Sequence, residues 1–346
     1  MTEASNAPDN AVDLVALAAW MDGQGLGRGA IDDVVRLAGG TQNILLKFSR
    51  AGRSYVLRRP PPVLRANSNE TMRREARVLA ALKGTGVPHP ELIAACPEED
   101  VLGAAFYLMQ PIEGYNPATG LPEPFVSSAQ LRREMGFSLV DGIAALGAQD
   151  YVALGLTGLG KPDNYLERQV GRWKAQLESY AEFPEWDGLK DLPDIDGVGR
   201  WLEEHRPRSF APGIIHGDYH LANVMYRFDA PKLAAIVDWE LTTIGDPLLD
   251  LGWLLATWPE DGATAVTVTP WEGFPSADEL VAHYAAQTTR DLSQIHWYGV
   301  LACYKLGIIL EGTYARACAG KAPKATGDQL HASTINLLER ANRWIS

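Results

Sequence analysis

The sequence predicts an α+β protein of two lobes, a small N-terminal lobe with an antiparallel sheet and one helix, and a larger, mostly helical C-terminal lobe. Three observations favour this fold class. Short β-branched segments punctuated by Gly and Pro fill residues 34–110, patterns of helical period dominate the rest, and one strand-rich segment at 213–240 interrupts them. We place the lobes at residues 1–111 and 112–346, because 346 residues suffice for two bodies with separate cores.

In the N-terminal lobe, β-branched residues and turn residues alternate along the chain. Pro60, Pro61 and Pro62 end the first meander, because proline has no backbone N–H to donate to a neighbouring strand. Ser68 is a candidate N-cap for the helix that follows. The expected elements are a helix over 10–21, strands over 34–37, 43–48 and 55–58, a helix over 68–82, and strands over 91–95 and 105–110.

The C-terminal lobe is predicted from apolar residues that recur at helical spacing. The expected helices cover residues 127–148, 165–181, 277–287 and 292–317. Between the second and third of these helices, residues 213–240 contain two short apolar segments that suit buried strands.

Composition narrows the class of partner. The chain has 31 Lys and Arg against 43 Asp and Glu, so its net charge of −12 argues against binding nucleic acid or an anionic membrane surface. The acidic net charge is compatible with an acceptor that carries positive charge. The N-terminal segment does not resemble a signal peptide, and three scattered cysteines suit a reducing compartment, so we expect a cytoplasmic protein. The sequence leaves the oligomeric state open, with a homodimer among the partners it allows.

The strongest chemical signal lies in the strand-rich segment. There the run from His216 through Gly217 and Asp218 to Asn223 is followed, fifteen residues after Asn223, by Asp238. Phosphoryl transfer needs a carboxylate beside the acceptor hydroxyl and hard oxygen ligands that hold Mg²⁺ against the nucleotide phosphates. We therefore expect Asp218 to accept the hydroxyl proton, and Asn223 and Asp238 to hold Mg²⁺.

These motifs resemble the aminoglycoside phosphotransferase and choline kinase family, which shares the protein-kinase-like fold. The His-Gly-Asp run stands where protein kinases have His-Arg-Asp, and Asp-Trp-Glu at 238–240 stands where they have Asp-Phe-Gly. The resemblance implies the bilobal kinase-like fold and transfer of the γ-phosphoryl group of ATP, with GTP as an open alternative, to a hydroxyl of a small molecule. The acceptor would be a small metabolite or an aminoglycoside-like compound.

The resemblance also implies a nucleotide site in the N-terminal lobe. It would combine a turn over the phosphates, residues that flank the adenine, a cation paired with a helix carboxylate, and hinge backbone that bonds the adenine edge. Gly40 and Thr41 would form the turn over the phosphates, and Val56 and Met109 would flank the adenine. Arg58 would be the cation paired with Glu75. The backbone of Gln110 and Ile112 would bond the adenine edge. An ordinary hairpin turn, a surface ion pair and a buried strand end explain the same residues, and Arg59 competes with Arg58.

Four further segments are similar to the kinase-like domain that some proteins carry fused to acyl-CoA dehydrogenase modules. They are residues 55–61, 165–169, 245–252 and 305–316. This branch implies a hydroxyacyl compound as acceptor. Asp250 and His216 would brace the catalytic loop, and candidate residues around the acceptor are Trp253, Tyr304 and Glu311.

Two other functions fit the same fold. A catalytically silent nucleotide-binding scaffold is one alternative, although Asp218, Asn223 and Asp238 are all present. A protein kinase is the other, but only about ten residues separate Asp238 from Leu248, which leaves no room for a long activation segment.

Overall fold

The computed structural model describes residues 12–37, 43–259 and 266–346. The chain divides into two compact units, and each is described by itself. We call Met1–Gly114, Val152–Leu156 and Ala234–Thr242 the N-terminal unit, and Tyr115–Tyr151, Thr157–Leu233 and Thr243–Ser346 the C-terminal unit. We predicted each lobe as one continuous segment, whereas the later segments Val152–Leu156 and Ala234–Thr242 pack with the N-terminal unit. Within the described residues, no helix is both long and apolar enough to cross a membrane.

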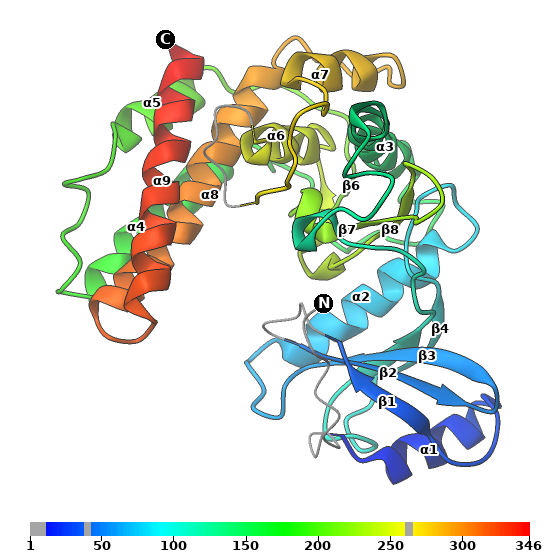
Figure 1. Cartoon of the computed structure of the whole chain (residues 1–346). Helices are drawn as coiled ribbons and strands as arrows, with labels where there is room; N and C mark the ends of the chain where they lie inside the picture. The colour runs from blue at the N-terminus through cyan, green and yellow to red at the C-terminus, as the bar shows by residue number, and fades with distance from the viewer. Residues whose placement is uncertain (1–11, 38–42, 260–265) are drawn as a thin grey trace. The chain divides into compact units, whose positions relative to one another are not determined.

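The N-terminal unit is built on a five-stranded antiparallel sheet in the order β1-β2-β3-β5-β4 (Figure 1). Val56 of β3 lies opposite Met109 of β5, which sets the register of the two central strands. The α+β class and the antiparallel sheet are therefore confirmed. The strands are β1 (Asp32–Arg36), β2 (Ile44–Arg50), β3 (Arg53–Arg59), β4 (Leu92–Cys96) and β5 (Phe106–Met109).

Helices cover both faces of this sheet, α1 (Leu14–Gly23) on one and α2 (Ser68–Leu82) on the other (Figure 1). Because successive strand residues point to opposite faces, Leu57 joins the core beneath α1, while Arg58 reaches a side chain of α2. Asp13 starts α1 by accepting hydrogen bonds from the backbone N–H groups of Val15 and Ala16.

The segment that carries Asp238 packs with the N-terminal unit through backbone contacts. The N–H of Ile236 donates to the carbonyl of Pro88 at 3.0 Å, and Nη2 of Arg74 donates to the carbonyl of Thr242 at 3.1 Å. Asp238 therefore has a fixed place beside α2, even though it lies far along the chain. It belongs to a turn between β8 (Leu233–Ile236) and the short helix η4 (Trp239–Leu241).

The C-terminal unit is mostly helical. Its two longest helices pack against each other, and α6 crosses one of them so closely that a Cβ on Gly252 would lie 2.6 Å from the backbone of Tyr298. The helices are α3 (Ala129–Gly147), α4 (Gln169–Ser179), α5 (Ile195–Glu204), α6 (Leu248–Thr257), α7 (Ala277–Ala285), α8 (Ile295–Cys318) and α9 (Lys324–Ile345), with short η1 (Pro117–Thr119), η2 (Tyr180–Glu182) and η3 (Leu221–Asn223).

A small antiparallel ladder positions the predicted catalytic loop of this unit. Strand β6 (Gly213–Ile215) pairs with β9 (Thr243–Gly245), so that Ile214 lies opposite Ile244. Buried His216 follows β6 directly, and α6 begins three residues after β9. The ladder thus brings the loop after β6 next to the start of α6. Short β7 (Val224–Tyr226) follows that loop.

Candidate active site

The loop after β6 is held by a buried carboxylate at the start of α6. The backbone N–H groups of His216 and Gly217 donate to Oδ2 and Oδ1 of Asp250 at 2.6 and 2.8 Å. Asp250 is buried, and burial raises the pKa of its carboxyl group although these hydrogen bonds act in the opposite direction. Asp250 braces the loop, as the sequence analysis expects.

Asp218 projects from this loop, and both of its carboxylate oxygens have partners. Nε2 of His220 lies 3.3 Å from Oδ1, and Nδ2 of Asn223 donates to Oδ2 at 2.9 Å. The N–H of Ala222 donates to Nδ1 of His220 at 3.1 Å, so Nε2 carries the ring N–H that points to Asp218. The predicted pair Asp218 and Asn223 thus lies together, and His220 joins it.

The electrostatic surroundings keep Asp218 ionised. Burial alone would raise the pKa of its carboxyl group, but the hydrogen bond and charge of His220, with His216 and Lys305, outweigh burial and lower the pKa to about 2. Burial also lowers the pKa of Lys305 to about 8, against the attraction of Asp218 and Asp250. The loop therefore carries an ionised carboxylate, Asp218, with the ammonium group of Lys305 nearby.

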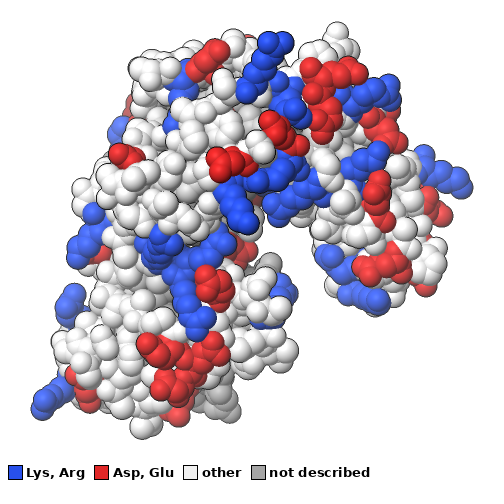
Figure 2. Space-filling model, turned by 180° about the vertical axis from the view of Figure 1, so that it is seen from behind, with Lys and Arg blue, Asp and Glu red and all other residues white. Residues whose placement is uncertain are grey.

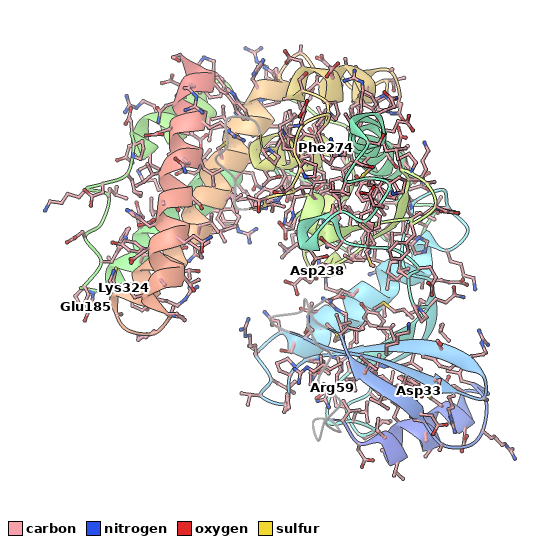
Figure 3. All side chains as sticks on the ribbon, in the orientation of Figure 1. Asp33, Arg59, Glu185, Asp238, Phe274 and Lys324 are labelled. Carbon is pink, nitrogen blue, oxygen red and sulfur yellow. The ribbon has the colours of Figure 1, made fainter. Side chains whose placement is uncertain are left out.

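In the N-terminal unit, Arg58 links two carboxylates. Its Nε lies 2.9 Å from Oε2 of Glu75, and its Nη2 lies 2.8 Å from Oδ1 of Asp238. The hydroxyl of Tyr107 donates to Oε2 of Glu75 at 2.7 Å. The predicted pairing of Arg58 with Glu75 is present, and Arg58 also holds Asp238. Figure 3 labels Asp238 and, at the end of β3, Arg59.

Burial dominates the pKa values of this cluster. The Glu75 carboxyl group is almost fully buried, and burial raises its pKa to about 6 although Arg58 and Tyr107 act to lower it. Burial also disfavours the charged form of Arg58, but Glu75, Tyr107 and Asp238 together raise its pKa above the ordinary value. Arg58 is therefore a permanent cation.

Asp238 has an unusual backbone conformation. Its φ of 65° and ψ of 66° lie in the left-handed region, which few residues other than glycine adopt without cost. The side chain of Asp238 stays 40% exposed, and Arg58 contacts its Oδ1. The turn thus keeps one side of a carboxylate open while a buried cation fixes the other.

The residues predicted to flank adenine lie on the two central strands. Val56 is buried, whereas Met109 is partly exposed on the strand beside it. The N–H of Gln110 already donates to the carbonyl of Glu91 at 2.9 Å, which leaves only its carbonyl for the predicted hinge contact. Ile112 is partly exposed after β5. The predicted phosphate turn, Gly40 and Thr41, lies outside the described residues.

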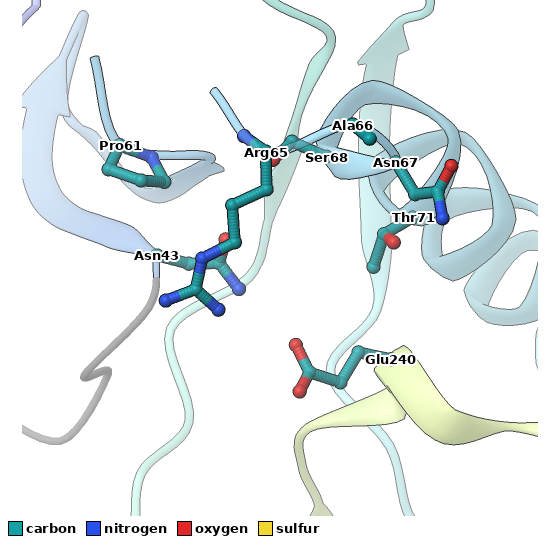
Figure 4. A pocket seen from close by; sticks show the side chains of 8 residues that line it. All are labelled: Asn43, Pro61, Arg65, Ala66, Asn67, Ser68, Thr71 and Glu240. Atoms are coloured by element: carbon teal, nitrogen blue, oxygen red, sulfur yellow. The ribbon is translucent and has the colours of Figure 1, made fainter. Parts of the chain in front are cut away.

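A cavity of about 310 Å³ lies beside the first turn of α2 in the N-terminal unit (Figure 4). In Figure 4 the side chain of Arg65 extends toward the same space as Asn43 and Glu240. Asn43 directly precedes β2, and Glu240 comes two residues after Asp238. The remaining lining residues are Pro61, Ala66, Asn67, Ser68 and Thr71.

Charge is mixed over the surface. Figure 2 shows Lys and Arg side chains close to Asp and Glu side chains on the face it presents. The net charge of −12 therefore does not appear there as a field of a single sign.

Three residues predicted around the acceptor have different surroundings in the C-terminal unit. Trp253 lies under the ammonium group of Lys305, with 4.2 Å between Nζ and the ring centroid. Tyr304 lines a separate groove of about 480 Å³ between α4 and α5. Glu311 is fully buried, where Nε1 of Trp186 donates to it at 2.7 Å. Glu311 thus has a structural role, which corrects its assignment to the acceptor pocket.

Sequence reasoning missed His220 and Lys305 as site residues. His220 lies two positions after Asp218 and contacts it, so its closeness along the chain is the signal that could have identified it. Gly217 and Lys305 are 88 positions apart, so no local sequence pattern predicts their contact.

Comparison with known proteins places the chain in a family. Residues 24–291 match the model of a phosphotransferase enzyme family. Acyl-CoA dehydrogenase family member 10 of Mus musculus is 28% identical over 87% of this chain, and member 11 of Homo sapiens is 28% identical over 90%. The chain spans only 28% and 40% of the length of those two proteins. The predicted similarity to that branch is confirmed.

Solved structures give the same result for the fold. A candidate aminoglycoside phosphotransferase from Ralstonia eutropha JMP134 is 29% identical, with a TM-score of 0.80 over 96% of this chain and 99% of the other. An ethanolamine kinase from Plasmodium vivax is 14% identical, with a TM-score of 0.59 over 90% of this chain and 83% of the other, and shares the fold. The kinase-like fold is confirmed, and the chain belongs to the phosphotransferase enzyme family.

Proposed function

We propose that this protein is a small-molecule kinase that transfers the γ-phosphoryl group of ATP to a hydroxyl of a metabolite. The observation that carries the proposal is the state of Asp218. It is an ionised carboxylate on a braced loop, with one oxygen held by His220 and the other by Asn223. Such a fixed hydrogen-bond acceptor is what an attacking hydroxyl requires.

In the proposed reaction, Asp218 orients the acceptor hydroxyl toward the γ-phosphorus. The hydroxyl oxygen forms a bond to that phosphorus, the bond from phosphorus to the bridging oxygen breaks, and ADP leaves. The hydroxyl proton passes to the carboxylate of Asp218 and then to solvent. Because its pKa is about 2, Asp218 is a weak base, and it contributes mainly by orientation, which suits a loose transition state.

The side chains proposed for Mg²⁺ offer the oxygen ligands that this ion prefers. Nδ2 of Asn223 is turned toward Asp218, and among the described residues none donates to its Oδ1. Asp238 keeps one carboxylate oxygen clear of Arg58. When bound, Mg²⁺ would neutralise charge on the nucleotide phosphates.

The N-terminal unit would bind the nucleotide. Arg58, fixed by Glu75, offers a permanent cation for phosphate, and the cavity that contains Arg65 adds a second one. Val56 and Met109 would flank the adenine. Relatives named as acyl-CoA dehydrogenase family members favour a hydroxyacyl acceptor, since a kinase domain in such proteins would act on related compounds.

Two substitutions test the proposal by ADP release in the presence of hydroxyl compounds. Asp218→Asn should lower kcat by about 10²–10⁴-fold, the usual contribution of such a group, with little change in the calorimetric Kd for Mg·ATP. Asp238→Asn should weaken Mg·ATP binding itself. Asp229→Asn, on the exposed surface, is the matched control and should behave as the unsubstituted protein.

The outcomes separate the kinase from the silent scaffold. Binding of Mg·ATP without ADP release over a broad library of alcohols would support the scaffold and overturn the kinase. An Asp218→Asn variant that turns over at the full rate would show that the role of Asp218 is assigned wrongly. Replacing ATP by GTP in the same assay decides the nucleotide preference.

A further inference from the structure

Lys305 lies between two tryptophan rings in the C-terminal unit. Its Nζ lies 4.2 Å from the ring centroid of Trp253 on α6 and 5.5 Å from that of Trp173 on α4. Lys305 itself belongs to α8, so three helices build this arrangement. A lysine that is only partly exposed and lies against aromatic faces has a restricted position, unlike a solvated surface lysine.

The same ammonium group reaches the loop of the proposed catalytic carboxylate. Nζ of Lys305 donates to the carbonyl of Gly217 at 3.3 Å, and Gly217 directly precedes Asp218. Within the described part of the chain Lys305 forms no ion pair, although the charges of Asp218 and Asp250 attract its ammonium group. The charge of Lys305 also acts on the Asp218 carboxyl group, so a hydroxyl that contacts Asp218 would lie in the field of this ammonium group.

The arrangement disfavours a positively charged acceptor. Aromatic faces are a common means of binding an ammonium ligand, but the faces of Trp173 and Trp253 are already occupied by the protein's own ammonium group. A cationic acceptor at Asp218 would meet a like charge. Arg172, which contributes to lowering the pKa of Lys305, adds a second positive charge nearby.

An unsatisfied donor points to the same chemistry. Nε1 of Trp253 is buried, and among the described residues none accepts a hydrogen bond from it. It belongs to the ring that Lys305 overlies. A buried N–H without a partner costs free energy, so an indole donor beside an ammonium group suits a ligand that brings hydrogen-bond acceptors and negative charge.

We propose that the acceptor carries an anionic group, a carboxylate or a phosphate ester, and that Lys305 is the residue that selects it. This proposal rests on the proposed function, since it assumes that a hydroxyl reaches Asp218. It reverses the expectation of a cationic acceptor that the net charge allowed. Lys305 is here a specificity-determining residue, and the transfer step itself still uses Asp218.

The test compares acceptors that differ only in the charge of one end. The probes are ω-hydroxyalkanoates from hydroxypropanoate to hydroxyhexanoate, the matching ω-hydroxyamides, the matching amino alcohols, and the phosphate monoesters of the matching diols. Binding is measured by calorimetry in the presence of Mg²⁺ and a non-hydrolysable ATP analogue, and transfer is measured by ADP release with ATP.

The variants are Lys305→Met, Lys305→Arg and a matched control, Lys321→Met. Lys321 also lies over an aromatic ring, that of Phe183 at 4.8 Å, but belongs to the exposed surface. We expect the unsubstituted protein to bind an anionic probe at least about tenfold more tightly than its amide, and Lys305→Met to abolish that preference. Lys305→Arg should restore most of it, and Lys321→Met should preserve it.

Several results would overturn the proposal. The first is equal affinity for an anionic probe and its amide, and the second is tightest binding of the amino alcohol. The third is that Lys305→Met loses the same affinity for the anionic probe as for the amide. The last result would assign Lys305 to bracing the loop or to the transferred phosphoryl group. Carboxylates and phosphate esters are compared directly, which distinguishes the two sources of negative charge.

The two proposals can fail separately. If anions bind through Lys305 but no probe supports ADP release, the kinase function fails and the anion site stands. If ADP release is as fast with amides and amino alcohols as with anions, the kinase stands and the selectivity of Lys305 fails. Circular dichroism of Lys305→Met and Lys305→Arg shows whether each variant is folded.

Discussion

The two units each place a cation beside carboxylates, but the two cations differ. In the N-terminal unit Arg58 contacts two carboxylates, those of Glu75 and Asp238. In the C-terminal unit Lys305 lies on tryptophan rings and donates to a backbone carbonyl, so its charge is not cancelled by a contacting carboxylate.

Under the proposed function, this difference suits two kinds of ligand. Arg58 has a pKa raised above its ordinary value, so its charge does not depend on pH, and its planar fork can grip phosphate oxygens. Lys305 has a pKa of about 8, so its charge responds to mildly alkaline pH. The arginine suits a constant partner such as a nucleotide, and the lysine suits recognition of an acceptor.

The largest expected effect is on the buried arginine. Arg58→Met would leave the carboxylate of Glu75 buried without its cation, and breaking a buried ion pair in this way costs about 3–5 kcal/mol of the free energy of unfolding. Urea titration followed by fluorescence measures the change. The same substitution at Arg73, whose pair with Glu99 is exposed, should cost less than about 1 kcal/mol.

If Arg58→Met and Arg73→Met lose equal stability, the N-terminal cluster is not the fixed ion pair that its burial indicates. The comparison between the two units would then rest on the lysine alone.

A smaller effect is expected at the brace of the catalytic loop. Asp250→Asn replaces one charged acceptor by an amide N–H that faces the backbone donors of His216 and Gly217, which should cost about 2–3 kcal/mol. The temperature of thermal unfolding and kcat should both fall, since the braced loop carries Asp218. Asp141→Asn, at a half-exposed site, is the control and should keep both values; a normal kcat in Asp250→Asn would mean the brace is dispensable.

The smallest effect is a pH dependence of the C-terminal unit. Lys305 is protonated below its pKa of about 8 and loses its charge as pH rises through that value. The KM for a hydroxyalkanoate should therefore rise up to about tenfold per pH unit above 8, while the KM for the amide stays constant. Lys305→Arg should abolish this rise between pH 8 and 10, because arginine remains protonated there. A parallel rise for acid and amide would exclude Lys305 as its source.

Much of the fold could be predicted because its elements carry local signals. Helix α2 begins and ends at the predicted residues because of its clear pattern of helical period, but Ser68 is its first residue and not the predicted N-cap, which is Asn67 and makes no side-chain capping hydrogen bond. Three α-helices of the described residues, α5, α6 and α9, were not predicted. Helix α6 is buried on almost every side, so its apolar residues show no period; α5 contains Gly197 and Gly199, which weaken its helical propensity.

Helix α9 was missed although it carries a usable signal. Leu330, Leu337, Leu338 and Ala341 recur near helical spacing, and only the absence of a capping residue at Pro323 obscures its start.

The site was predictable only where its residues lie close along the chain. The spacing of Asp218 and Asn223 places both in one loop, and the two do lie together. The predicted roles of both residues in catalysis and metal binding stay predictions. Lys305 contacts this loop from a helix 88 residues away, and only the packing of α6 against α8 brings it there.

Gly252 allows the close helix packing that positions Lys305 over Trp253. It lies on α6 next to Trp253, and a methyl group in its place would collide with the backbone of Tyr298 on α8. The missing side chain lets the two helices touch, and the indole of one thereby meets the ammonium of the other. Choice of acceptor could thus be retuned by a residue buried in a helix crossing, without altering any group that meets the ligand.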